Sequence, residues 1–223
     1  MAIAYDAFSS GSGTGSTLTV SHTTTGSNVG LAAGVFLTDS SSRTITSVTY
    51  NGVAMTEQYQ YINATNRRIG LFTLAVGAGV GAKNIVVTLS GAPSNGVALL
   101  ATSYSGVAQT GTVDNKTKQD NSGTPSPLTA TLTTVADNCW LIGMAATARA
   151  NSAGTSTTKR GGIANFDEYG AYDTNAAKTP AGSVSVQATM SPNDFYGSMM
   201  AVSFAPYVAA ATSTYPALEL AGN

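Results

Sequence analysis

Apolar residues alternate with threonine and serine along most of this chain, with the two-residue period of a β-strand. No segment of a dozen residues keeps the 3.6-residue period of an amphipathic helix. Successive side chains of a strand point to opposite faces, so such a segment buries its apolar face and leaves its hydroxyl groups in water. Clusters of Gly, Pro and Asn interrupt the pattern at short intervals. The sequence therefore predicts an all-β fold with little helix.

The strongest local signal is Asn51-Gly52, which separates two alternating segments. Both residues tolerate the positive φ of a type I′ turn, whose twist matches that of the strands it joins. A two-residue loop places Tyr50 opposite Val53. The next pair on the same face is Val48 with Met55. We therefore predict a hairpin whose four apolar side chains share one buried face.

Five less polar segments indicate strands that are covered on both faces: 29–38, 69–76, 96–104, 139–147 and 196–204. Two other stretches, 107–127 and 148–162, look irregular and are expected to be long loops. Loops of that length in a compact domain are usually functional or mobile.

The chain also repeats part of its own pattern. Residues 18–31 align with residues 128–141, and residues 98–104 align with residues 198–204. Each half would open with a threonine-rich strand, turn at an asparagine and close with an apolar strand that ends in an aromatic residue. The repeat indicates two structurally similar halves.

Two architectures are compatible with this repeat: one sandwich built from two similar halves, as in a jelly roll of two Greek keys, or two small sandwiches in tandem. We favour a single two-sheet β-sandwich of jelly-roll type over residues 1–205, with halves at about 1–107 and 128–205. The reason is that the second half lacks a clear counterpart of the Asn51-Gly52 hairpin.

Residues 206–223 lose the alternation and are predicted to form an extended C-terminal tail. If this tail is ordered, we expect it to run along a neighbouring subunit; a frayed terminus is the alternative. The candidate interface residues are Tyr207, Tyr215, Leu218 and Leu220.

Residue types that carry most catalysis and metal binding are scarce. The chain has one histidine, His22, and one cysteine, Cys139, and its 10 basic and 11 acidic residues stand against 32 threonines and 24 serines. A single cysteine excludes an internal disulfide, and we expect a buried thiol. Oxygen-bearing side chains at 114–121 could suit Ca²⁺, but the spacing fits no EF-hand and two lysines oppose a cation. We predict no catalytic residues, no cofactor and no metal.

A glycosidase is the third-ranked hypothesis. It needs two carboxylates about 5–10 Å apart across a cleft. Asp167 and Glu168 are adjacent on an expected strand and therefore point to opposite faces. The remaining pairing to consider is Glu57 with Glu168. Asp173 is the third acid of this region, and together with Asp167 and Glu168 it flanks Tyr169 and Tyr172.

Charge and terminal sequence restrict partners and location. The basic residues are scattered, which argues against nucleic acid. Residues 1–6 lack the features of a secretory signal, and the longest apolar stretch, 31–37, is too short to span a membrane. A hydroxyl-rich surface indicates work outside the cell, whereas the lack of a signal and of disulfides indicates folding in a reducing cytoplasm. A virion component, made in the host cytoplasm and exposed outside, satisfies both.

Tyrosine is the main aromatic residue, with ten copies. Planar rings on a sandwich face can stack on sugars, but amphipathic tyrosines also pack at core edges and interfaces. The candidate glycan contacts are Tyr59, Tyr61, Tyr169 and Tyr172.

Seven short segments together resemble the jelly-roll-type β-sandwich modules of tailed-phage virion proteins and of some bacterial surface proteins: 5–8, 18–22, 29–37, 45–55, 71–74, 101–107 and 201–204. The resemblance implies a capsid decoration or cement protein, or a tail appendage, without a catalytic motif. Its implied partners are other virion proteins and further copies of the chain, with host-surface glycans as a possible addition. We therefore expect a non-enzymatic virion structural protein. The alternative is a carbohydrate-binding module on a phage fibre or bacterial surface.

Overall fold

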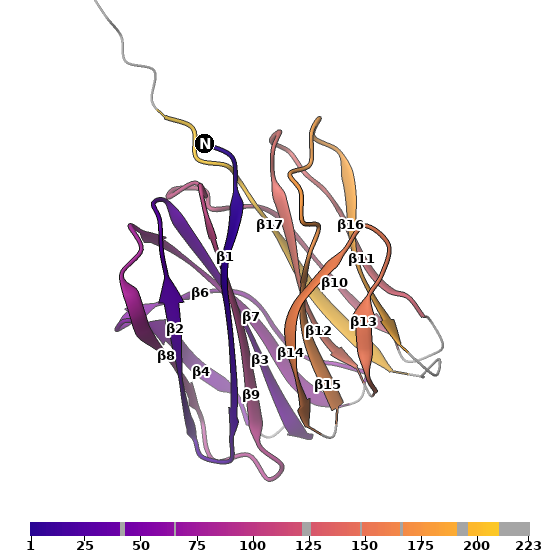
Figure 1. The fold of residues 1–223 in the computed structure, drawn as a ribbon. Helices are drawn as coiled ribbons and strands as arrows, with labels where there is room; N and C mark the ends of the chain where they lie inside the picture. Colours follow the sequence, from indigo (N-terminus) through magenta and orange to yellow (C-terminus); the bar gives the residue numbers. More distant parts are fainter. Residues whose placement is uncertain are drawn as a thin grey trace, which may run out of the picture.

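The computed structural model describes residues 1–40, 43–64, 66–121, 126–147, 149–165, 167–190 and 196–209. Over these residues the chain forms antiparallel strands and no helix, which confirms the all-β prediction (Figure 1). No helix in this part of the chain is therefore long and apolar enough to cross a membrane.

The first half forms two sheets. Its strands are β1 (Ala4–Gly13), β2 (Thr17–Thr24), β3 (Val29–Ser40), β4 (Ile45–Tyr50), β5 (Val53–Ala54), β6 (Thr56–Ile62), β7 (Arg67–Gly77), β8 (Gly81–Leu89) and β9 (Val97–Ser105). The first inner sheet has the order β1-β9-β3-β7-β6, and the first outer sheet has the order β2-β8-β4-β5. Leu31, Val48 and Ile85 belong to the apolar core between these two sheets.

The second half repeats this arrangement. Its strands are β10 (Val113–Asn121), β11 (Leu128–Thr133), β12 (Trp140–Thr147), β13 (Asn151–Ala153), β14 (Thr158–Asn165), β15 (Asp167–Asp173), β16 (Ser183–Met190) and β17 (Gly197–Phe204). The second inner sheet, β10-β17-β12-β15-β14, has the strand order of the first inner sheet. The second outer sheet, β11-β16-β13, lacks a counterpart of β5.

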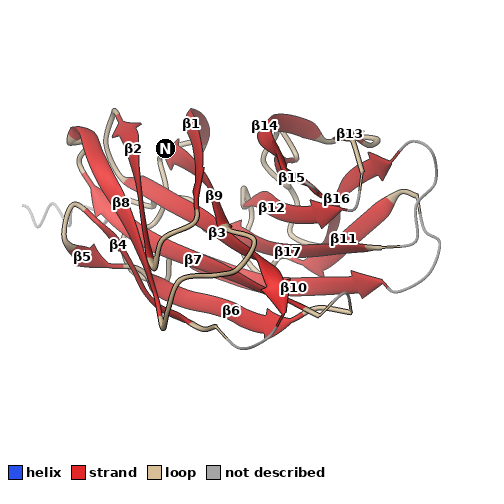
Figure 2. Ribbon diagram, turned by 90° about the horizontal axis from the view of Figure 1, so that it is seen from below, coloured by secondary structure: helices blue, strands red, loops and turns tan. Residues whose placement is uncertain are grey.

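The two inner sheets pack face to face, so the layers run outer, inner, inner, outer (Figures 1 and 2). Phe36 from β3 stacks on Tyr169 from β15 in this central core, with ring centroids 4.6 Å apart. The β-sandwich class and the two similar halves are confirmed, but the expected two sheets are four. The physical reason is that β9, β12 and β17 are buried along nearly their whole length, so the inner sheets need cover on both faces. The strand orders are compatible with the jelly-roll type, which stays a prediction.

The edges of the two inner sheets meet at two places, here called seams, and the two seams are equivalent to each other. On one side β1 of the first half lies against β14 of the second. On the other side β6 lies near β10, because the Lys116 ammonium donates a hydrogen bond to the Gln58 carbonyl at 3.0 Å. Since β14 and β10 are the counterparts of β6 and β1, the two halves meet as the subunits of a two-fold dimer do.

The predicted hairpin is confirmed at its turn and corrected beyond it. Asn51 and Gly52 have φ of 50° and 79°, and Tyr50 pairs with Val53. Val53, however, is 55% exposed, because β5 ends after two residues. The chain passes at Met55 from the outer sheet to β6 in the inner sheet.

The two expected long loops are wrong in part. Residues 113–121 form β10, and residues 151–153 and 158–165 form β13 and β14. β10 and β14 are edge strands of their inner sheets, and edge strands carry polar side chains on both faces. For that reason no apolar alternation marks them in the sequence.

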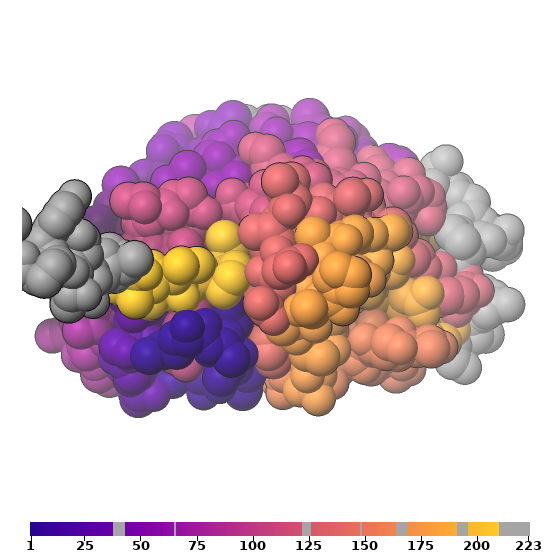
Figure 3. Space-filling model, turned by 90° about the horizontal axis from the view of Figure 1, so that it is seen from above, coloured from indigo at the N-terminus to yellow at the C-terminus, as the bar shows by residue number. Residues whose placement is uncertain are grey.

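The N-terminus lies beside the end of β17 and the described residues after it, which are yellow in Figure 3 where the N-terminal residues are indigo. Tyr207 donates its backbone N–H to the Gly106 carbonyl at 2.8 Å and accepts from the Met1 ammonium at 3.1 Å. Tyr207 is thus half-buried against its own first half. The other three candidate interface residues, Tyr215, Leu218 and Leu220, lie outside the described residues.

Candidate functional site

Each half places an aspartate in a bulge of its first strand. Asp6 accepts hydrogen bonds from the Ser103 hydroxyl at 2.7 Å and from a backbone N–H just after β2 at 3.0 Å. Asp114 accepts from the Ser203 hydroxyl at 3.1 Å and from two backbone N–H groups just after β11. A charged acceptor bonded to backbone amides is a strong structural contact. These carboxylates therefore hold the first, second and last strands of each half together.

Asp173 and Arg160 form an ion pair at the seam between β1 and β14. The Asp173 side chain is fully buried, and Arg160 donates to it from Nε at 2.6 Å and from Nη2 at 3.1 Å. The Tyr104 hydroxyl donates to Asp173 at 2.8 Å, and the Arg160 guanidinium lies 4.1 Å from the centroid of the Tyr5 ring. Burial, reinforced by Asp173, raises the pKa of Tyr104 well above its usual value. This arrangement joins the two halves.

The acids of the glycosidase hypothesis do not form a described pair. Glu57 accepts a hydrogen bond from Gln60 at 2.9 Å on the exposed face of β6. The side chain of Glu168 lies outside the described part of the structure. Across the ranges that the structure does describe, no group of three or more His, Cys, Asp and Glu side chains could hold a metal ion.

The four candidate glycan contacts do not share a surface. Tyr169 and Tyr172 are 1% and 0% exposed, so their rings cannot stack on a sugar, and this part of the prediction is wrong. They face the core because β15 is an interior strand of the second inner sheet. Tyr59 and Tyr61 are half-buried on β6, where the ammonium groups of two lysines of β10 lie 5.2 and 4.0 Å from their ring centroids. These two rings seal the second seam.

Cys139 is fully buried, as expected of a core thiol. Burial raises the pKa of this thiol to about 12, with a further contribution from Asp114. A thiol with such a pKa stays protonated near neutral pH, so it is a poor nucleophile and metal ligand.

His22 is buried in the first sandwich. Its Nδ1 lies 2.9 Å from the Ser9 hydroxyl, and its ring meets Tyr50 edge-on. Its Nε2 is buried and has no hydrogen-bond partner among the residues that the structure describes. Burial lowers the pKa of His22 from 6.5 to about 4, against a smaller opposing effect of Asp6. The imidazole is therefore neutral in the folded protein at neutral pH.

We expect this histidine to make folding weaken in acid. The unfolded chain takes up a proton at His22 as pH falls below about 6.5, whereas the folded chain does so only near pH 4. The part of the free energy of unfolding that depends on neutral His22 is complete above pH 6.5 and is lost as the pH falls to 4. It amounts to about 3 kcal/mol. Urea unfolding at several pH values, compared with His22→Leu, measures it. Leucine is the matched replacement because Leu132 occupies the corresponding position of β11; equal pH profiles for both proteins would contradict the assignment.

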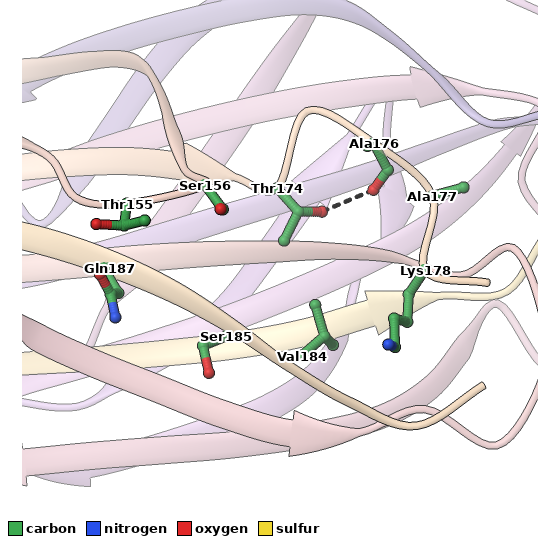
Figure 4. A pocket seen from close by; sticks show the side chains of 9 residues that line it. All are labelled: Thr155, Ser156, Thr174, Ala176, Ala177, Lys178, Val184, Ser185 and Gln187. Carbon is green, nitrogen blue, oxygen red and sulfur yellow. Dashed lines mark hydrogen bonds between the residues drawn. The ribbon is translucent and has the colours of Figure 1, made fainter. Parts of the chain in front are cut away.

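The second outer sheet ends in an open pocket of about 340 Å³ (Figure 4). Loop residues 155–156, 174 and 176–178 line one side of it, and Val184, Ser185 and Gln187 of β16 line the other. Val184 is half-buried and packs at the edge of the second sandwich core. The lining is neutral except for Lys178.

The first half shows what this pocket lacks. In the first half Val48 of β4 pairs with β8, and the corresponding pair in the second half joins Ala153 of β13 to β16. Two residues further along the chain, Tyr50 of the first half therefore corresponds to Thr155 of the second. Tyr50 is 1% exposed, and its ring closes that end of the first core, with its hydroxyl 3.0 Å from the Thr24 hydroxyl. Thr155 is exposed and leaves the corresponding space open.

Among the described residues, β16 also lacks a backbone partner on the pocket side at Ser185, which lines this pocket. The Gln187 carbonyl accepts from the Gly154 N–H at 3.0 Å, so the backbone groups of Ser185, two residues away, point to the same side. Within the described chain no backbone group pairs with Ser185 on that side. In the first half the corresponding Asn84 carbonyl accepts from the Asn51 N–H at 3.0 Å. A pocket of about 440 Å³ lies there too, but it is lined by the turn and by the start of β8, and its strand edge is paired.

Sequence reasoning missed this edge, although its signal was present. The second half has no counterpart of the Asn51-Gly52 hairpin, and the structure shows that β13 is three residues long where β4 has six. The chain matches no protein-family model, no curated protein and no solved structure.

Proposed function

We propose that this protein is a non-enzymatic structural protein of a virion, either a capsid decoration or cement protein or a surface appendage, and that it stabilises an assembly through repeated protein–protein contacts. The observation that carries the proposal is the unpaired edge of β16 beside an open pocket. An exposed strand edge is a template for pairing with another chain, and natural proteins usually protect it. Here it faces outward on the second outer sheet.

The outer sheets suit such a role. The residues of β2 alternate between buried and exposed, and Thr17, Thr19, Ser21 and Thr23 all face outward. On β11, Thr131 shares a hydrogen bond of 2.8 Å with Ser185 of β16. Neutral hydroxyl faces on both sides of the molecule limit charge repulsion between crowded copies, and many small contacts gain from multivalency.

The acids that are positioned inside the molecule have structural partners, which also favours this proposal. Asp6 and Asp114 hold strands together, and Asp173 joins the two halves. The partners we propose are other virion proteins and further copies of this chain. Its proposed place is the virion, after synthesis in the host cytoplasm.

The carbohydrate-binding alternative is weaker, because two of its four tyrosines are in the core. Tyr59 and Tyr61 remain as partly exposed rings, each beneath a lysine. The glycan hypothesis therefore depends on half of its original contacts.

The test is mass spectrometry and immunogold electron microscopy of purified particles from a culture that makes this protein. We expect a constant number of copies per particle and regularly spaced label. Protein found only free of particles would overturn the proposal. Retention on host polysaccharide that is lost in a Tyr59→Ala/Tyr61→Ala variant would promote the glycan alternative instead.

A further inference from the structure

We propose that the C-terminal segment of a second copy of this chain pairs with the open edge of β16 and inserts Tyr215 into the adjacent pocket. This inference rests on the proposed function as an assembly protein, and it names the contact through which copies associate. The pocket and the unpaired backbone of Ser185 are the receiving site.

The receiving site lacks the aromatic side chain that closes the corresponding end of the first core. In the first half Tyr50 enters from the neighbouring strand β4 and closes the core, whereas Thr155 stands at the corresponding place in the second half. An aromatic ring supplied by another chain would bury the partly exposed Val184. Burial of an aromatic side chain in a preformed pocket is a usual centre of binding energy.

The C-terminal segment carries the matching residues. Thr214-Tyr215 repeats the Thr49-Tyr50 pair that ends β4 in the first half. Pro216 follows Tyr215 directly and has no N–H to donate, so it would end the added strand. A short added strand is sufficient, because β13 already pairs with β16 from Ala188 to Met190. Glu219 lies four residues after Tyr215 and can meet Lys178 at the pocket rim.

The geometry favours a second copy over the chain's own tail. Tyr207 is hydrogen-bonded to Met1 and Gly106, so residues 205–209 lie beside the first half (Figure 3), whereas the residues of β16 that line the pocket belong to the outer sheet of the second half. The 14 residues from 210 to 223 span at most about 50 Å when extended, which is ample to reach an adjacent molecule. Pairing between copies also repeats from one molecule to the next, as an assembly requires.

Disulfide trapping in the full-length chain tests the proposal. One protein carries Ser185→Cys and another carries Thr214→Cys; the native Cys139 is buried in both. After mixing under mild oxidation, we expect a disulfide-linked heterodimer whose yield rises with protein concentration. Adding Tyr215→Ala to the second protein should weaken association by about thirtyfold, as expected for a central aromatic contact. Thr155→Tyr in the first protein, which fills the pocket from within, should prevent the link.

The matched control moves the first cysteine to Asn84, the position in the first half that corresponds to Ser185. Its carbonyl is already bonded to Asn51, so we expect no link. Equal linking at Asn84, or linking that Tyr215→Ala leaves unchanged, would overturn the proposal. A link found only within a single chain carrying both cysteines would show that the tail binds its own molecule. If no link forms while particles still contain the protein, this inference fails and the proposed function stands.

Discussion

Replacing Asp173 by alanine is expected to lower the free energy of unfolding by about 3–5 kcal/mol. The variant leaves Arg160 in the seam without its counter-charge, and Arg160 is only 14% exposed. It also removes the acceptor of the Tyr104 hydroxyl, which is fully buried. A buried charge or hydroxyl that loses its partner retains its full desolvation cost, which is why the expected loss exceeds that of a surface ion pair.

Urea unfolding followed by tryptophan fluorescence measures this loss, since Trp140 belongs to the same central core. Glu57→Ala is the control, because that acid lies on the exposed face of β6, and we expect its stability to be close to that of the parent. The double variant Asp173→Leu/Arg160→Met should recover part of the loss, because no uncompensated charge remains. A loss below about 1 kcal/mol for Asp173→Ala would contradict the structural role assigned to the pair.

Phe36→Ala is expected to cost about 3–5 kcal/mol and to loosen the contact between the two halves. Phe36 is fully buried and stacks on Tyr169, with an angle of 15° between the ring planes. The two rings belong to different inner sheets, so the cavity left by alanine would open in the layer that joins the halves. Each half also has its own core between its inner and outer sheets, and this core can stay folded at temperatures at which the central core has already opened.

Scanning calorimetry measures both consequences. We expect one transition for the parent and a lower, broader or split transition for Phe36→Ala. Phe36→Leu is the matched control, since it keeps most of the buried volume and should cost less. Equal losses for the two variants, or a single unshifted transition for Phe36→Ala, would contradict the view that this ring pair holds the halves together.

Local patterns predicted most of the strands. The internal repeat located the threonine-rich strands β2 and β11, and the apolar segments located the interior strands β3, β7, β9, β12 and β17. The repeat of an asparagine turn in each half is confirmed, because Asn28 and Asn138 have φ of 53° and 62°. These features depend on residues that are close together in the sequence, so they can be recognised without knowledge of the tertiary structure.

The candidate site was harder to predict. The sequence offered Tyr169 and Tyr172 as candidate glycan contacts, because an amphipathic tyrosine in a strand has the same local pattern on a surface as in a core. Their burial depends on Phe36 and the other residues of the opposite sheet, which lie far away along the chain. The open edge at Ser185 became visible only when the second half was compared with the first, strand by strand.

The amino-acid sequence alone determined that this protein is made of strands, where most of them lie and that its halves are alike, because side-chain alternation and turn chemistry act over a few residues. The tertiary structure alone decided that there are four sheets, that Asp173 meets Arg160 in a seam and that one outer sheet is left incomplete. Those outcomes depend on which faces remain uncovered after each half has folded, and that is a property of contacts between residues distant in the chain.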